Sequence, residues 1–259
     1  MLNYSDSDIE NLLAGIYGGD ITDNELPEDL YFSIADYLKK ALYKGFGGGL
    51  LDFELGGTKL ELLTELRENI YMFSAAKTYQ EVKDISSFLI DESGARRSAK
   101  QFRDLGREAF STWNDAWGET ERATAIGQGR MAVKWDNIEA NAEILPVLVF
   151  DTKGNPCPEC KPFEGFAAPV HDKVWNWLMP LLHFNCGCTV RQEESDYKLS
   201  SKSRYKSVAG MRDDVPDLFQ MNPGKDKVVF SDAHPYFDVA KKDKGFAADN
   251  FGMPIPDKD

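Results

Sequence analysis

Histidine and cysteine are scarce in this chain, with three and four among 259 residues. No apolar run approaches the roughly 20 residues that a transmembrane helix needs, and the first residues lack the basic and apolar parts of a signal peptide. We therefore expect no membrane association and folding in a reducing cytosol. In that compartment, paired cysteines bind metal or do redox chemistry more often than they form structural disulfides.

Basic residues are also in the minority, because 30 Lys and Arg stand against 43 Asp and Glu, for a formal charge of −13. Affinity for nucleic acid depends largely on neutralising phosphates, so this balance argues against a general DNA-binding protein. One local basic segment leaves a DNA contact open, although a solvated helix face or loop explains it as well. The segment contains Lys198, Lys202, Arg204 and Lys206.

The first 140 residues have the pattern of helices. Ser5 and Asp8 form a capping box before an apolar stripe of helical spacing, and Thr58 and Glu61 form a second. Between them lie Pro27, suited to a first helical position, and the apolar positions Leu30, Ile34, Leu38 and Leu42, with Gly45 and the run Gly47–Gly49 after them. The glycines predict the end of that helix and a flexible connector. Thr120 is suited to cap a further helix that runs to about Trp135. We predict a bundle of roughly five or six helices in residues 1–140.

The pattern changes after residue 140. Residues 144–150 are apolar and favour a strand, and Pro146 predicts an edge position in the sheet. Residues 151–156 predict a turn. We expect two or three short strands in a module of residues 141–195, followed by an extension of residues 196–259. The stretch Gly252–Pro256 cannot be helical, and such a tail often docks on a partner or is mobile. The predicted fold class is therefore α+β.

All four cysteines lie between residues 157 and 188, where they form two closely spaced pairs. Cys157 and Cys160 make a C-x-x-C turn that can present two thiolates to one ion, and zinc binds four tetrahedral ligands. In an extended segment Cys186 and Cys188 project to the same face, whereas in a turn His183 and Cys186 converge. The four cysteines lead as zinc ligands, with His183 as a substitute or as a group that hydrogen-bonds to the ligands. Disulfides, a redox pair and unliganded thiols stay open.

Other zinc chemistry lacks its partner motifs. The P-C-x-x-C sequence matches half of a nucleobase deaminase signature, but no upstream H-x-E exists, and H-E-x-x-H is also absent. A thioredoxin-like site would need a βαβ context. We expect His171 and His234 to be ordinary surface or loop histidines, and no catalytic residue is predicted. A hydrolase would need an open metal position and a general base such as Glu159, Glu164 or Asp172, each more typical of a solvated loop.

An ordered set of residues from about 115 to 192 resembles the phage head morphogenesis, or minor head protein, family (Mu F-like). Its pattern is a helix that begins near T-E and carries small residues, then D-x-x-x-C-x-x-C, a glycine and P-x-x-H-x-N-C-x-C. The chain departs from it at Gly187, where the family commonly has Arg. It also separates Pro180 from His183 by Leu181 and Leu182, where the family is often more compact. The matching positions are Thr120–Ala125, Gly127, Gly129, Arg130, Asp151, Cys157, Cys160, Gly165, Pro180 and His183–Cys188.

The resemblance implies a minor structural protein of a tailed-phage particle, present in few copies inside the head near the portal, and in the host cytoplasm during assembly. Its expected partners are the portal protein and, further, the major capsid or scaffold protein. Its expected role is head morphogenesis and DNA packaging or delivery. In this reading zinc holds together a module with little core of its own. The alternative is a zinc-dependent nuclease or peptidase that acts in head maturation.

Overall fold

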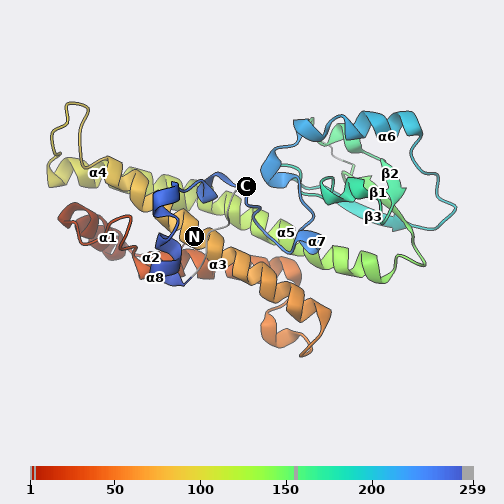
Figure 1. Cartoon of the computed structure of the whole chain (residues 1–259), viewed down its shortest axis with the longest axis horizontal. Helices are drawn as coiled ribbons and strands as arrows, with labels where there is room; N and C mark the ends of the chain where they lie inside the picture. Colours follow the sequence, from red (N-terminus) through yellow and green to blue (C-terminus); the bar gives the residue numbers. More distant parts are fainter. Residues whose placement is uncertain (1, 3, 155–156, 253–259) are drawn as a thin grey trace. The chain divides into compact units, whose positions relative to one another are not determined.

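The computed structural model describes residues 2, 4–154 and 157–252, and it confirms the predicted α+β class (Figure 1). Its N-terminal part is helical and is followed by a small three-stranded sheet. The N-terminal helices are α1 (Asp6–Gly18), α2 (Glu28–Phe46), α3 (Thr58–Ser87), α4 (Ala99–Ser111) and α5 (Trp117–Ala140). Within the described part of the chain, no helix is both long and apolar enough to span a bilayer.

The chain forms two compact units. The first, here called the helical unit, comprises Met1–Lys40, Glu68–Arg122 and His234–Asp259. The second, the cluster unit, comprises Ala41–Arg67 and Ala123–Ala233. Helices α2, α3 and α5 each contribute residues to both units. The predicted division into residues 1–140, 141–195 and 196–259 rests on changes in the pattern of the sequence and stays a prediction.

Helix α1 follows the sequence prediction closely. The Ser5 hydroxyl accepts a hydrogen bond from the Asp8 backbone, and the Asp8 carboxylate accepts one from the Ser5 backbone, which completes the capping box. The helix ends where Gly19 adopts a φ of 90°, a conformation that costs glycine little. Of its predicted apolar stripe, Leu12, Leu13 and Ile16 are buried and Ile9 is half-buried.

Helix α5 begins earlier than predicted. A π-helical turn, Thr112–Ala116, connects α4 directly to α5, so Thr120 lies inside the helix, where its hydroxyl donates to the Ala116 carbonyl at 3.4 Å. The prediction that Thr120 caps a new helix is therefore wrong. The π-helical turn buries Trp113 and Asn114. Such turns insert one extra residue per turn and frequently mark functional or strained sites.

Glycine lets the end of α2 pack against α5 within the cluster unit. A Cβ atom on Gly45 would lie 2.0 Å from the Ile126 carbonyl oxygen, and one on Gly129 would lie 2.9 Å from the Leu42 carbonyl oxygen. Gly45 lies inside α2, which continues to Phe46, so it does not end the helix as predicted. Gly47, with a φ of 97°, lies directly after the helix as predicted.

The sheet consists of β1 (Val147–Asp151), β2 (Ala167–Pro169) and β3 (Thr189–Glu193), in the order β2-β1-β3 with antiparallel pairing (Figure 1). Strand β1 is thus central, and the predicted edge position is wrong. Pro146 precedes the strand, and its carbonyl oxygen accepts a hydrogen bond from the Val170 amide at 2.9 Å. The missing proline N–H therefore interrupts no ladder bond.

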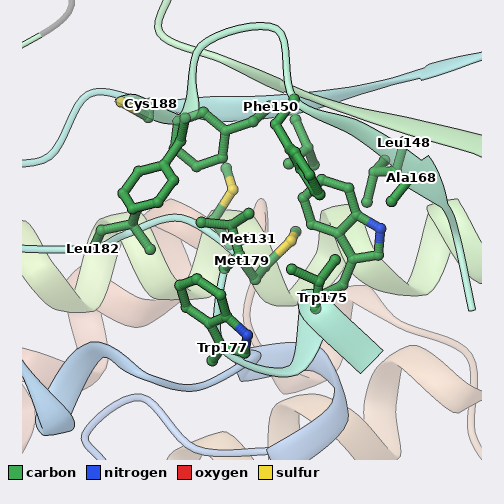
Figure 2. Packing of buried hydrophobic residues seen from close by; sticks show 14 of the residues in the cluster. Met131, Leu148, Phe150, Ala168, Trp175, Trp177, Met179, Leu182 and Cys188 are labelled. Atoms are coloured by element: carbon green, nitrogen blue, oxygen red, sulfur yellow. The ribbon is translucent and has the colours of Figure 1, made fainter. Parts of the chain in front are cut away.

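The cluster unit has a larger core than its sequence indicates. Figure 2 shows side chains of α5, the sheet and the segment before the second cysteine pair packed together, including Met131, Phe150, Trp175, Met179 and Leu182. Each of these side chains is at most 5% exposed. A metal ion in this unit would therefore add to an existing core rather than replace one.

The C-terminal part contributes to both units. Helices α6 (Lys202–Ala209) and α7 (Pro223–Asp226) belong to the cluster unit, and α8 (Phe246–Phe251) belongs to the helical unit. The ring of Phe251 stacks on that of Tyr31 with centroids 4.0 Å apart. The predicted irregular tail, from Met253 onward, lies outside the described residues.

Candidate metal centre

All five predicted ligands come together in the cluster unit. The Nε2 atom of His183 lies 3.0 Å from Sγ of Cys157 and 3.3 Å from Sγ of Cys160. The Sγ atoms of Cys160 and Cys186 are 3.7 Å apart. The donor atoms form two groups of three that each fit within 4.8 Å, Cys157–Cys160–His183 and Cys160–Cys186–Cys188. Cys160 belongs to both groups, so the two pairs form one Cys/His cluster.

The first cysteine pair is positioned by a turn. The Lys161 amide donates to the Cys157 carbonyl at 2.9 Å, and a 3-10 helix, Lys161–Phe163, follows. This turn directs Cys160 into the core, where it is fully buried, while Cys157 is half-buried. Part of the turn predicted before Cys157, Asn155 and Pro156, lies outside the described residues.

The second pair is preceded by a turn that contains Asn185. The Cys186 amide donates to the His183 carbonyl at 3.3 Å, and Asn185 has a φ of 60°. Asn tolerates this left-handed conformation better than most residues. The segment therefore turns between His183 and Cys186, while the donor atoms of Cys186 and Cys188 fall in one ligand group and that of His183 falls in the other.

The ring of His183 is oriented as a metal ligand. Its Nδ1 atom lies 2.7 Å from the Phe184 carbonyl oxygen. A carbonyl oxygen only accepts, so Nδ1 carries the hydrogen and the lone pair of Nε2 points to the thiols of Cys157 and Cys160. A backbone carbonyl commonly fixes a zinc-binding histidine in this way. His183 is therefore a direct ligand candidate rather than only a neighbour of the ligands.

All four cysteines are free thiols. The 3.7 Å between Cys160 and Cys186 far exceeds a disulfide bond of about 2.05 Å. It matches the spacing of about 3.8 Å that two sulfur ligands of a tetrahedral zinc ion adopt. The Cys160 and Cys188 thiols lower the pKa of Cys186 by hydrogen bonding to its sulfur, and the contact with Cys186 raises the pKa of Cys160. The cluster thus favours one thiolate before any metal binds.

The carboxylates considered as general bases mostly serve the fold. Glu164 accepts a hydrogen bond from the Thr152 amide at 2.8 Å. Asp172 accepts from the Val174 amide and from the Tyr205 hydroxyl, at 2.9 and 2.6 Å. Glu159 alone adjoins the cluster; the pKa of this exposed residue is lowered by its own backbone N–H and by Cys157. Among the described residues, no carboxylate joins either ligand group.

The other two histidines lie outside the cluster. His171 is exposed, as expected. His234 is only 6% exposed and belongs to the helical unit, where its Nδ1 accepts from the Tyr236 amide and its ring meets that of Phe73 edge-on. His234 thus lies in a loop, as expected, but it is buried rather than at the surface, because the aromatic rings that cover it include one distant in sequence, Phe73.

The sequence did not reveal a buried polar network in the helical unit. The ammonium group of Lys77 lies 2.6 Å from the carboxylate of Glu121, and Glu81 accepts a hydrogen bond from the Asn114 amide at 2.6 Å. Lys77, Glu81, Asn114 and Glu121 are each at most 4% exposed. One signal was present, because Glu121 is the acidic residue of the T-E pair.

Glycines of the motif lie at close contacts in the cluster unit. A Cβ atom on Gly127 would come within 2.6 Å of the Leu181 side chain, next to the His183 turn. Gly165, with a φ of 68°, donates its amide to the Phe150 carbonyl. A Cβ atom on Gly187 would meet no atom within 4 Å. The position where the family commonly has Arg is therefore open, and the departure there perturbs no packing.

Comparisons with models of known protein families, with curated proteins and with solved structures find no match to this chain. The resemblance to phage minor head proteins therefore stays a prediction from the motif residues. The geometry supports a coarser statement: the chain has a Cys/His cluster that could hold a metal ion.

Proposed function

We propose that the cluster binds one zinc ion in a closed, structural site, with His183 and three of the cysteines as ligands. The observation that carries this proposal is the pair of groups that share Cys160, with spacings of 3.0–3.7 Å between neighbouring donor atoms. Sulfur-rich sets with one histidine are typical of structural zinc. His183 and the four cysteines together offer five donors, one more than a four-coordinate ion needs.

A structural role fits the surroundings better than a catalytic one. Catalytic zinc keeps a position for water and has a general base nearby. Here five donors compete for four positions, and Glu164 and Asp172 are engaged with the backbone. Glu159 is the one carboxylate that would revive the hydrolase hypothesis, because it is exposed beside Cys157.

We further propose that the chain is a minor structural protein of a tailed-phage head. In this role it would associate with the portal protein, and with the major capsid or scaffold protein, during head morphogenesis and DNA packaging or delivery. Support comes from the ordered motif and from the contact between its parts: Gly127 of the motif helix adjoins Leu181, two residues before His183. The negative charge favours protein partners, with any DNA contact confined to the exposed Lys198, Lys202 and Lys206.

The zinc proposal is tested by metal analysis and X-ray absorption at the zinc edge on the full chain. We expect about one zinc ion per chain with three sulfur ligands near 2.3 Å and one nitrogen ligand near 2.0 Å. A site with four protein ligands excludes a bound water. A spectrum with an oxygen ligand and only two sulfurs would contradict the structural role and favour the hydrolase.

The phage proposal is tested by co-expression with a portal protein from the genome that encodes this chain, followed by purification through the portal. We expect co-purification of the wild type and of Gly187→Ala, and loss for Cys160→Ser. Gly187→Ala is the matched control, because a side chain there meets open space. Failure of the wild type to bind portal, capsid or scaffold protein would contradict the proposal.

A further inference from the structure

A surface pocket of about 410 Å³ opens beside the metal cluster, within the cluster unit. Its volume falls within the range of ligand sites, roughly 300–1,000 Å³. Phe163, Leu182 and Val215, all buried residues of the core, contribute apolar lining, and Met211 is half-buried against them. The pocket is therefore a ready-made apolar depression in a folded unit.

The charged side chains that line this pocket are both acidic. Glu159 and Asp214 contribute carboxylates to the lining, and both are exposed. The lining contains no Lys or Arg among the described residues. Two nearby cations are engaged in other contacts: the guanidinium of Arg212 donates to Gln220 at 2.8 Å, and that of Arg204 donates to the carbonyl of the lining residue Pro162. An apolar group that enters this pocket would be favoured if it carried positive charges beside it.

The pocket and the metal cluster share structure. Glu159 lies between Cys157 and Cys160 in the first ligand turn, and His183 contributes to the pocket lining. A divalent ion bound by three thiolates and one neutral imidazole has a net charge of −1, which adds to the negative charge of the rim. Metal binding would also fix the turn that carries Glu159.

We propose that this pocket docks a segment of a partner protein that presents an apolar side chain between Lys or Arg residues, and that the bound metal ion shapes the pocket for it. The metal dependence rests on the zinc site proposed above. The apolar residues receive the side chain, and Glu159 and Asp214 pair with the flanking cations. In this proposal the turn from Cys157 to Cys160 recognises a partner protein as well as binding metal.

The test uses the zinc-containing full chain with 13C-labelled methionine methyl groups, followed by NMR. The probes are the capped tripeptides Arg-Leu-Arg, Glu-Leu-Glu and Arg-Gly-Arg. We expect Arg-Leu-Arg to shift the Met211 methyl signal, identified with Met211→Leu, and to saturate it at about millimolar concentration, as suits a minimal peptide. Glu-Leu-Glu and Arg-Gly-Arg should bind at least about fivefold more weakly, which corresponds to about 1 kcal/mol.

Charge variants give the matched comparison. Asp214→Asn should weaken Arg-Leu-Arg about threefold, in line with an exposed ion pair. Asp213→Asn, which removes the same charge next to the pocket but outside its lining, should change binding less than twofold. No shift of Met211, equal binding of the acidic peptide, or equal effects of the two variants would overturn the docking proposal.

Zinc content, measured on the same samples, separates this proposal from the one it rests on. Zinc present with no peptide response contradicts the pocket and leaves the metal site intact. Peptide binding that is unchanged after chelation contradicts the metal dependence. A chain that binds no zinc contradicts the metal site itself, whatever the peptides do.

Discussion

Lys77 and Glu121 form an ion pair in the interior of the helical unit, with 2.6 Å between Nζ and Oε2 and side chains only 1% and 5% exposed. The Lys77 ammonium also donates to the Trp113 carbonyl at 2.7 Å, and the Tyr236 hydroxyl donates to Glu121 at 2.9 Å. The pair thus connects α3, the π-helical turn and the C-terminal segment. Because both charges are desolvated, each depends on the other.

We expect Lys77→Met to lower the free energy of unfolding by about 3–5 kcal/mol, because it leaves the buried Glu121 carboxylate without its cation. Glu121→Gln should be comparably damaging, since it leaves the ammonium unpaired. The double variant should be markedly more stable than the sum of the single effects predicts. Urea unfolding followed by circular dichroism measures all three, and additive losses would show that the two residues are not coupled.

The buried carboxyl of Glu81 should make the free energy of unfolding depend on pH. The pKa of Glu81 is raised to about 8, mainly because the side chain is buried; the nearby Lys77 charge opposes this rise. The folded chain therefore keeps this proton while the unfolded chain loses it above about pH 4.5. The stabilising contribution is complete below pH 4.5, decreases as pH rises, and is lost as pH passes 8.

We expect Glu81→Gln to remove this dependence, because the amide is neutral and can still accept from Asn114. At pH 8.5 the variant should be more stable than the wild type by on the order of 4–5 kcal/mol, and near pH 4.5 the two should be alike. Unfolding at several pH values gives this difference directly. A difference that does not vary with pH would show that Glu81 titrates normally.

The close contact at Gly127 predicts that a larger side chain there destabilises the cluster unit. A methyl group there would lie 2.6 Å from Leu181 Cδ1, so Gly127→Ala must displace the segment that leads to His183. We expect a loss of about 1–3 kcal/mol, typical of overpacking, and weaker zinc retention. Gly187→Ala is the control and should match the wild type in both thermal unfolding and zinc content. Equal stability of both variants would mean that Leu181 simply moves aside.

The sequence predicted what depends on local chemistry and missed what depends on distant contacts. The Ser5–Asp8 capping box and the gathering of Cys157 with Cys160 follow from spacing and side-chain chemistry. The central position of β1 does not, because Pro146 signals only that one N–H is missing. The burial of Lys77 depends on a π-helical turn that no local pattern announces.

The role of His183 shows the same limit within the site. Its spacing from Cys186 allowed either a ligand or a supporting group. Only the direction of its ring, with Nδ1 toward the Phe184 carbonyl and Nε2 toward the thiols, favours the ligand. The turn that follows His183 contains the left-handed Asn185, a conformation that the sequence permits but does not require.

The shared position of Cys160 predicts unequal effects of the cysteines on metal binding. Cys160 belongs to both ligand groups, whereas Cys188 belongs to one. Cys160→Ser should therefore lose nearly all zinc, because each group is left with two donors. Cys188→Ser keeps Cys157, Cys160, His183 and Cys186 as four ligands and should retain about one zinc ion per chain, with affinity lowered less than tenfold. Zinc analysis after dialysis against a chelator compares the two, and retention of zinc by Cys160→Ser would show that Cys160 is not a required ligand.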